Sequence, residues 1–227
     1  FLQTPSIAVE QSLRELSDMA ILAKENIDRS FASLINEDMS ESEKIADVEY
    51  RIDFLTSKLT SFFIKISSVS ISKDDEKLIG GLHHVTNDIE RLGDYAVLLV
   101  KETSYMKDQD VKFLDQTKEE LTEIHGLISE MFDLAFEAFT KRSTKNFRKI
   151  SDLHKEILAL ISDTRNEHVA RLSSEMYPVE VSKSIYSVLF SLQRIADHIV
   201  NVAFSIRSTT GSKTEAFQAI EKEKKKA

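Results

Sequence analysis

Apolar residues along this chain recur at alternating steps of three and four, the spacing that places side chains along one side of an α-helix. A mean period of about 3.5 residues is typical of near-antiparallel helices packed in a bundle. The pattern therefore predicts an all-α fold. Three segments show it most clearly: Ile45, Val48, Ile52, Leu55, Leu59, Phe62 and Ile66; Leu78, Leu82, Val85, Ile89, Leu92, Ala96 and Leu99; and Val181, Ile185, Val188, Leu192, Ile195, Ile199 and Val202.

Helix starts are marked by two local signals. Ser40 with Glu43 three residues later has the spacing of a capping box, and Pro178 suits the first turn of a helix. With these starts, the periodic segments predict helices at residues 5–37, 41–70, 74–103, 110–142, 144–172 and 177–207.

The second half of the chain repeats the order of motifs found in the first half. We therefore expect two tandem three-helix bundles related by an internal repeat. The predicted units are residues 1–106, residues 107–207 and a charged, disordered tail at 208–227. The matching segments are residues 25–28 with 130–133, 45–49 with 150–154, and 90–94 with 193–197.

Composition narrows the class of protein. The chain has 227 residues with 30 Lys and Arg against 38 Asp and Glu, so its formal net charge is −8. An acidic chain without a basic stripe is a poor binder of nucleic acid, because phosphate contacts dominate that affinity. The absence of cysteine excludes disulfides, thiolate metal sites and cysteine nucleophiles. The small numbers of glycine (5) and proline (2) favour long helices.

No apolar run approaches the ~20 residues of a membrane-spanning helix, so we expect no membrane insertion of this segment. The opening residues 1–5 lack the charged start and apolar centre of a signal peptide. They also lack an initiator methionine, and we expect the chain to be a piece of a longer protein.

Pairs of acidic side chains one helical turn apart are the main candidate chemistry. Glu90 and Asp94 form one pair, and Glu49 and Asp53 form another on the preceding predicted helix. Both pairs lie outside the apolar seams, so the four carboxylates converge on an outer groove if these helices are neighbours. Such oxygen ligands suit Fe, Mn, Mg or Ca, and also Zn. The alternative is that these acids are solvated or paired with the nearby arginines 51 and 91. Gly93, placed inside the predicted helix, indicates a close approach by a neighbour.

The segment Asn87–Ala96 (NDIERLGDYA) and its echo Ser191–His198 (SLQRIADH) resemble the paired motifs of the PhoU family of phosphate-uptake regulators. The opening segment, residues 1–11 (FLQTPSIAVEQ), resembles the stretch after the last membrane helix of bacterial sodium/phosphate cotransporters, whose cytoplasmic C-terminal region is PhoU-like. The resemblance implies two three-helix bundles with multinuclear iron or zinc clusters on their outer surface. The matching ligand positions in the first bundle are Glu49, Asp53, Glu90 and Asp94.

The second bundle departs from this family pattern. His154 stands at the position of Glu49, Leu158 at that of Asp53, and Gln193 at that of Glu90. An amide and a hydrocarbon remove charge and ligand capacity, so His154, Gln193 and Asp197 form a much poorer metal site. We expect weak or absent metal binding in this half.

The resemblance implies a non-catalytic cytoplasmic regulatory domain of a sodium-dependent phosphate cotransporter, located at the cytoplasmic face of the membrane. Its partner would be the membrane domain of the parent transporter, and a homodimer is compatible with this role. A second interpretation is a free-standing PhoU-type adaptor that regulates an ABC phosphate transporter and a sensor kinase.

Interpretations of other classes are a metal-dependent enzyme and a helical spacer. None of the six histidines has a glutamate three residues before it, as di-iron bundles require, and outward carboxylates leave no dry cavity for catalysis. The interrupted seams and the repeat favour compact bundles over an extended spacer.

Overall fold

The computed structural model describes residues 5–68, 72–172 and 178–210. Within these residues the chain forms six α-helices and no β-strand, which confirms the predicted all-α fold. The helices are α1 (Pro5–Asn36), α2 (Ser42–Ser67), α3 (Lys73–Asp108), α4 (Asp115–Thr140), α5 (Phe147–Leu172) and α6 (Val179–Thr210). No helix in the described part of the chain has both the length and the apolar character needed to cross a membrane.

Several predicted helix boundaries differ from the observed ones, and the helix predicted at 74–103 continues to Asp108. Ser40 does not cap α2; its hydroxyl donates instead to Asp38 at 2.7 Å, and the helix begins two residues later. The helix predicted to start at residue 110 starts at Asp115, because Phe113 is buried in the core and holds the preceding link in a non-helical path. The last helix reaches Thr210, inside the predicted tail 208–227, and the rest of that tail lies outside the described residues.

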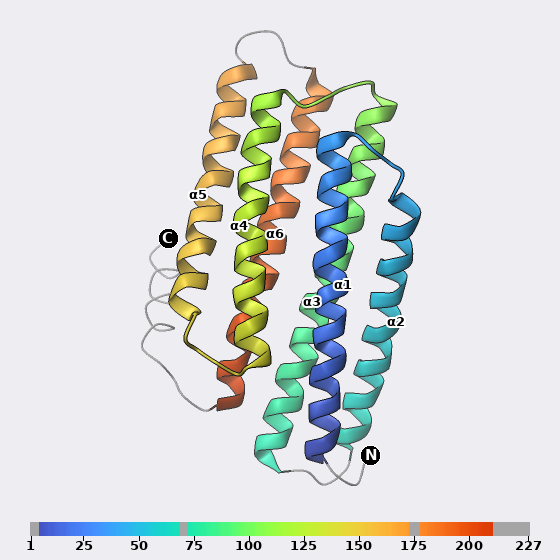
Figure 1. Ribbon diagram of the computed structural model, residues 1–227, viewed down its shortest axis with the longest axis vertical. Helices are drawn as coiled ribbons and strands as arrows, with labels where there is room; N and C mark the ends of the chain where they lie inside the picture. The colour runs from blue at the N-terminus through green and yellow to red at the C-terminus, as the bar shows by residue number, and fades with distance from the viewer. Residues whose placement is uncertain (1–4, 69–71, 173–177, 211–227) are drawn as a thin grey trace.

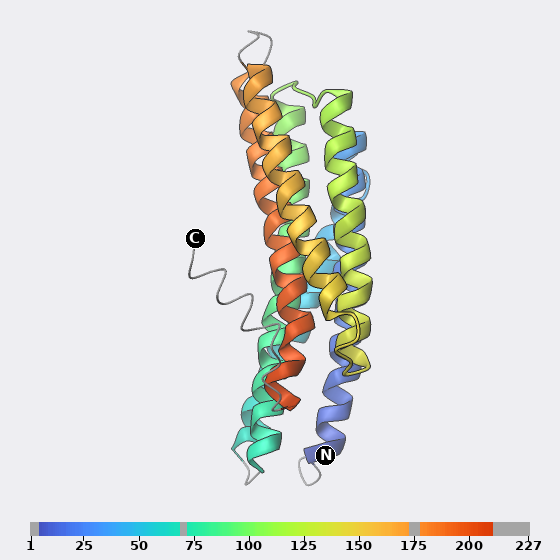
Figure 2. The same ribbon diagram turned by 90° about the vertical axis from the view of Figure 1, so that its left-hand side faces the viewer.

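The six helices run up and down along one long axis in two layers (Figures 1 and 2). α1 and α4 form one layer, α3 and α6 form the other, and α2 and α5 lie at opposite edges. Among the described residues, α2 contacts only α1 and α3, and α5 contacts only α4 and α6. The second trio therefore reproduces the arrangement of the first.

A single apolar core runs through both trios, and α3 contacts α6 more extensively than any other helix pair. The predicted seams of α3 and α6 are buried except at Leu78, which is partly exposed. On α2 the buried phenylalanine is Phe63 and not the predicted Phe62, which is only partly buried. The boundary between units at residues 106 and 107 stays a prediction, because the two trios share this core.

The repeat extends to the ends of the helices. Glu37 closes α1 and Arg142, 105 positions later, closes α4, and both have positive φ angles (56° and 49°). The residue after each donates a backbone hydrogen bond to the carbonyl five positions earlier, Asp38 N to Ser33 O and Ser143 N to Ala138 O. This is the Schellman closure, here made with non-glycine residues in the left-handed conformation.

Candidate functional site

The candidate site lies where α2 and α3 approach each other closely. A Cβ atom at Gly93 would lie 3.2 Å from Cδ1 of Ile52, closer than ordinary van der Waals contact, so glycine allows the two helices to approach without moving this side chain. Each helix carries one acid three residues before its contact residue and another one residue after it. The packing of Gly93 on Ile52 therefore places all four predicted carboxylates around one point: Glu49, Asp53, Glu90 and Asp94.

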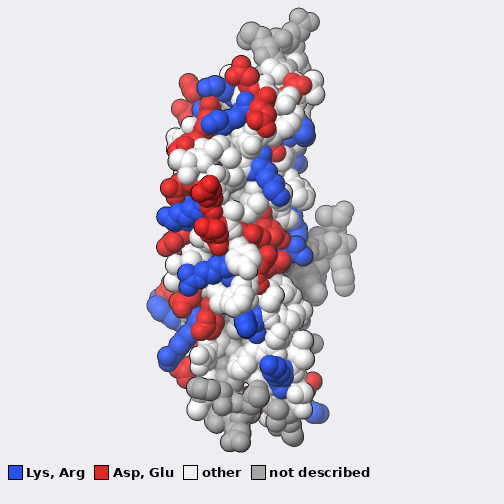
Figure 3. All heavy atoms as spheres, turned by 90° about the vertical axis from the view of Figure 1, so that its right-hand side faces the viewer, with Lys and Arg blue, Asp and Glu red and all other residues white. Residues whose placement is uncertain are grey.

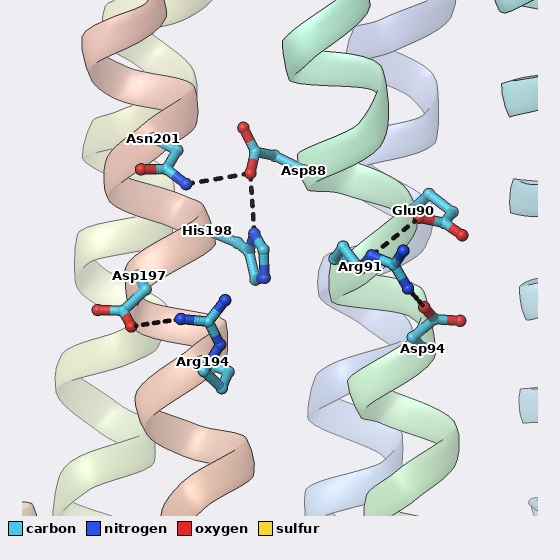
Figure 4. Close-up of polar contacts among 8 residues, drawn as sticks. All are labelled: Asp88, Glu90, Arg91, Asp94, Arg194, Asp197, His198 and Asn201. Atoms are coloured by element: carbon cyan, nitrogen blue, oxygen red, sulfur yellow. Dashed lines mark hydrogen bonds and ion pairs between the residues drawn. The ribbon is translucent and has the colours of Figure 1, made fainter.

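These side chains occupy the outer edge of the helix contact, as predicted. Glu90 and Asp94 expose 24% and 34% of their side-chain surface, and Asp53 is exposed. Arg91 binds the α3 pair, with Nη1 2.8 Å from Oδ2 of Asp94 and Nε 3.6 Å from Oε2 of Glu90 (Figure 4). Glu90 and Asp94 lie on the side of α3 that faces away from α6, and the Arg91 side chain extends across the helix toward them.

The carboxylates act on one another electrostatically. Partial burial raises the pKa of Glu49, and the negative charges of Asp53 and Asp94 raise it further. Burial also raises the pKa of Glu90, as does the charge of Asp94, while Arg91 opposes the increase. The site thus concentrates negative charge that a cation would relieve.

The donor set suits a hard cation, but its side chains do not point at a common centre. In the described part of the chain, no three His, Asp or Glu side chains are arranged to hold a metal ion. Glu90 and Asp94 are directed toward Arg91, and Glu49 shares a hydrogen bond with Asp53. A metal would have to displace Arg91 and turn these side chains, so metal binding here stays a prediction.

At the equivalent surface of the second half, one acid binds two basic side chains. Nε2 of His154 lies 2.8 Å from Oδ1 of Asp197, and Nη1 of Arg194 lies 3.1 Å from Oδ2. Partial burial would raise the pKa of Asp197, but the bond and charge of His154 and the charge of Arg194 hold it below its ordinary value. Gln193 and Leu158 carry no charge. The second half therefore has one acid at this site, bound to basic side chains, whereas the first half has four acids.

The sequence did not predict a polar cluster that joins the two halves between α3 and α6. Nδ1 of His198 lies 2.8 Å from Oδ1 of Asp88, and Asn201 donates to the same oxygen at 3.2 Å (Figure 4). A hydrogen bond with Tyr95 of α3 also raises the pKa of Arg194 on α6. Asp88 and His198 both lie within the two recognised motifs, but nothing in the sequence indicated that these motifs face each other across the repeat.

Comparisons with known proteins agree with the repeated fold. The family model of the PhoU domain matches the sequence twice, over residues 16–103 and 121–206. No curated protein sequence matches the chain significantly.

Two solved structures have a similar fold. PhoU from Pseudomonas aeruginosa is 18% identical, with a TM-score of 0.85 over 92% of this chain and 100% of that chain. The phosphate transport system regulatory protein PhoU from Streptococcus pneumoniae is 16% identical, with a TM-score of 0.81 over 93% of this chain and 100% of that one. At these identities the likeness concerns the fold alone.

Proposed function

Because the chain belongs to the PhoU domain family, we propose that it is a non-catalytic regulatory domain of phosphate transport. The observation that carries this proposal is the double match of the family model, whose two ranges include the Glu90…Asp94 motif and its echo at Gln193…Asp197. The outward carboxylates favour binding over catalysis, since they lie partly exposed to solvent at the outer edge of the α2–α3 contact.

The transport system we infer is a sodium-dependent phosphate cotransporter, with this domain at its cytoplasmic face. The resemblance of residues 1–11 to the segment that follows the last membrane helix supports this choice over a free-standing adaptor. Regulation would follow if the domain contacts two states of the membrane domain with different affinities, because only differential binding shifts an equilibrium.

Phosphate uptake by intact cells tests this function. We would delete residues 16–206 in frame from the native gene and measure uptake of radiolabelled phosphate with and without external sodium. We expect a changed uptake rate that requires sodium. A change that persists without sodium would favour the adaptor interpretation. Unchanged uptake in both conditions would contradict a role in phosphate transport.

We further propose that Glu49, Asp53, Glu90 and Asp94 bind iron, zinc or another divalent metal. Burial and mutual repulsion raise the pKa values of Glu49 and Glu90, so a cation that replaces Arg91 would relieve a strained set of charges. Oxygen donors of this kind suit hard cations, and their spacing around Gly93 keeps them within reach of one another.

Elemental analysis of the chain purified without chelator tests the metal proposal. We expect bound metal in the wild type and its loss in the Glu90→Ala/Asp94→Ala variant. The matched control is Gln193→Ala/Asp197→Ala at the equivalent positions of the second half, which should retain the metal. Equal metal content in all three proteins would exclude the proposed ligands.

A further inference from the structure

The two trios meet along the α3–α6 contact, and the outer side of this contact has no other described helix over it. α1 packs on α3 and α4 packs on α6 from the inner side, while α2 and α5 lie at the edges. Figure 4 views the pair from the outer side, with α1 and α4 behind it. Three contacts fix the antiparallel register of α3 and α6: Asp88 with His198, Glu102 with Ser184, and Tyr105 with Lys183.

This register places Leu98 of α3 beside Phe190 of α6. Leu98 lies ten residues after Asp88, about 15 Å along α3, and Phe190 lies eight residues before His198, about 12 Å along α6. Each side chain points about 80° away from the residue that faces the partner helix, and because the helices are antiparallel both point to the same side. Leu98 is 43% exposed and Phe190 is 57% exposed. The two residues therefore form one apolar patch across the boundary of the trios.

Aromatic and basic side chains extend this patch in both directions along the helices. Toward one end, Arg194 of α6 shares a hydrogen bond with Tyr95 of α3. Toward the other end, Nζ of Lys183 lies 3.9 Å from the ring centre of Tyr105. We call this surface the outer strip; its residues are Tyr95, Leu98, Tyr105, Lys183, Phe190 and Arg194.

The internal repeat shows that the fold does not require an apolar patch here. At the offset that aligns the two motifs, Leu98 corresponds to Asn201 and Phe190 to Asn87. Both asparagines are exposed, so the same helix pair carries polar residues at one end and apolar residues at the other. The exposure of Leu98 and Phe190 is a property of this sequence and not of the helix packing.

Positive charges flank the apolar patch. Lys101 lies one turn after Leu98, and Lys183 lies two turns before Phe190; both lysines are exposed. Within the described residues, neither lysine forms an ion pair with a carboxylate. The outer strip therefore offers positive charge to a partner, although the whole chain has a net charge of −8.

The acids nearest the outer strip already have partners in the chain. Glu102 accepts a hydrogen bond from the buried Ser184, and Asp94 is bound by Arg91. Figure 3 shows a different surface at the edge that α2 occupies, where acidic side chains gather near mid-height. That surface would repel an acidic partner, whereas the outer strip would attract one.

We propose that the outer strip binds an acidic amphipathic α-helix of another protein. The apolar face of that helix packs on Leu98 and Phe190, and its Asp and Glu side chains face Lys101 and Lys183. A helix suits the strip, because the distance from Tyr95 to Tyr105 is about 15 Å, or three turns, and helical anchors recur at steps of three and four. The proposal concerns a surface separate from the four carboxylates and does not depend on the role in phosphate transport.

A designed peptide tests the chemistry of the partner. The probe is a fluorescent helical peptide of about 18 residues with leucines at steps of three and four and glutamates on both sides of this stripe. Fluorescence anisotropy with the 227-residue chain should give a Kd of about 10–100 µM. A control peptide with lysine in place of every glutamate should bind at least ~10-fold more weakly. No binding of the acidic peptide below ~1 mM, or equal binding of both peptides, would overturn the proposal.

Substitutions of equally exposed apolar residues locate the surface. Phe190→Glu removes the apolar anchor and adds a repelling charge, so it should weaken the acidic peptide at least ~10-fold. Ile21→Glu is the control, because Ile21 is 56% exposed on α1 in the opposite layer, and it should leave the Kd unchanged. Circular dichroism and thermal unfolding would show that both variants fold. Equal affinity of Phe190→Glu and wild type would exclude this face.

Charge reversal then tests the role of the two lysines. Lys101→Glu/Lys183→Glu should weaken the acidic peptide and strengthen the lysine peptide. Lys58→Glu/Lys65→Glu on α2 changes the net charge by the same amount and should alter neither affinity by more than about 2-fold. If both double variants change the two affinities equally, the attraction is not local to the outer strip and the proposal fails.

Sedimentation velocity without peptide tests a second copy of this chain as the occupant. Wild type and Phe190→Glu should sediment alike, because the proposed partner is absent from both samples. A dimer that forms in the wild type and is lost in Phe190→Glu would assign this face to contacts between copies and overturn the proposal.

Discussion

The two halves of this protein place different side chains on equivalent positions of the same helical frame. Around the α2–α3 contact, four carboxylates surround Gly93, and one arginine binds two of them. Around the α5–α6 contact, Ala196 stands at the position of Gly93, and His154 and Arg194 bind Asp197. The difference shows that the same helical arrangement accepts different residues on the outer surface of each half.

A second difference lies inside the core. In the first half, Phe63 on α2 faces His83 on α3, with ring centres 6.4 Å apart. At the equivalent positions of the second half, His168 on α5 faces Tyr186 on α6 at 5.8 Å. Both halves place an imidazole beside an aromatic ring. The histidine lies on α3, the third helix of its trio, in the first half, and on α5, the second helix of its trio, in the second half. Consequently only the second half buries a histidine completely.

The largest expected effect concerns the close contact at Gly93. Gly93→Leu would force a bulky side chain against Ile52 and should lower the free energy of unfolding by about 3 kcal/mol, as overpacked cores do. Urea denaturation followed by circular dichroism measures this change. Gly126→Leu on α4 is the control, because nothing lies within 4 Å of a Cβ placed there, and it should be neutral or stabilising. Equal destabilisation of both variants would show that the α2–α3 contact has no special tightness.

A smaller loss is expected at the cluster that joins the halves. Asp88→Ala leaves His198 and Asn201 without their shared acceptor at a partly buried position and should cost about 1 kcal/mol of unfolding free energy. Asp88→Asn keeps one oxygen acceptor and should recover part of that loss. The same denaturation experiment measures both. If Asp88→Ala unfolds like the wild type, the cluster does not stabilise the junction of the two trios.

The buried histidine predicts a pH dependence specific to the second half. Burial lowers the pKa of His168 from its ordinary value near 6.5, and the charge of Arg171 lowers it further. The unfolded chain therefore binds a proton that the folded chain resists, so stability falls as the pH drops below about 6.5. His168→Phe, which installs the residue of the first half, should reduce the loss of unfolding free energy between pH 7.5 and 5.5. An identical pH profile for both proteins would contradict this assignment.

The smallest effect is expected on the outer face of α2. Phe54→Ser removes an exposed side chain and should change the unfolding free energy of the monomer by no more than about 0.5 kcal/mol. Urea denaturation followed by circular dichroism measures this change. A large loss would mean that Phe54 stabilises its own chain despite its exposure.

Much of this site could be predicted from sequence because its spacing is local. Glu90 and Asp94 share a helix face by the geometry of a single turn, and Gly93 marked the close contact before its partner was known. The convergence of α2 and α3 followed once both were assigned to one bundle. The Asp88–His198 contact could not be predicted, since it joins residues 110 positions apart and no periodicity within either helix specifies the distance between them.

The sequence by itself determined the six helices, the repeat and the loss of acidic residues in the second half, because helical periodicity and residue identity are properties of the chain. The tertiary structure decided which faces remain exposed and which charges meet. His198 of α6 meets Asp88 of α3, α3 packs against α6, and the outer face of the edge helix α2 has no described helix over it. Only the packing of the six helices brings such residues together or leaves them uncovered, since the burial of the apolar seams sets the positions of the helices relative to one another.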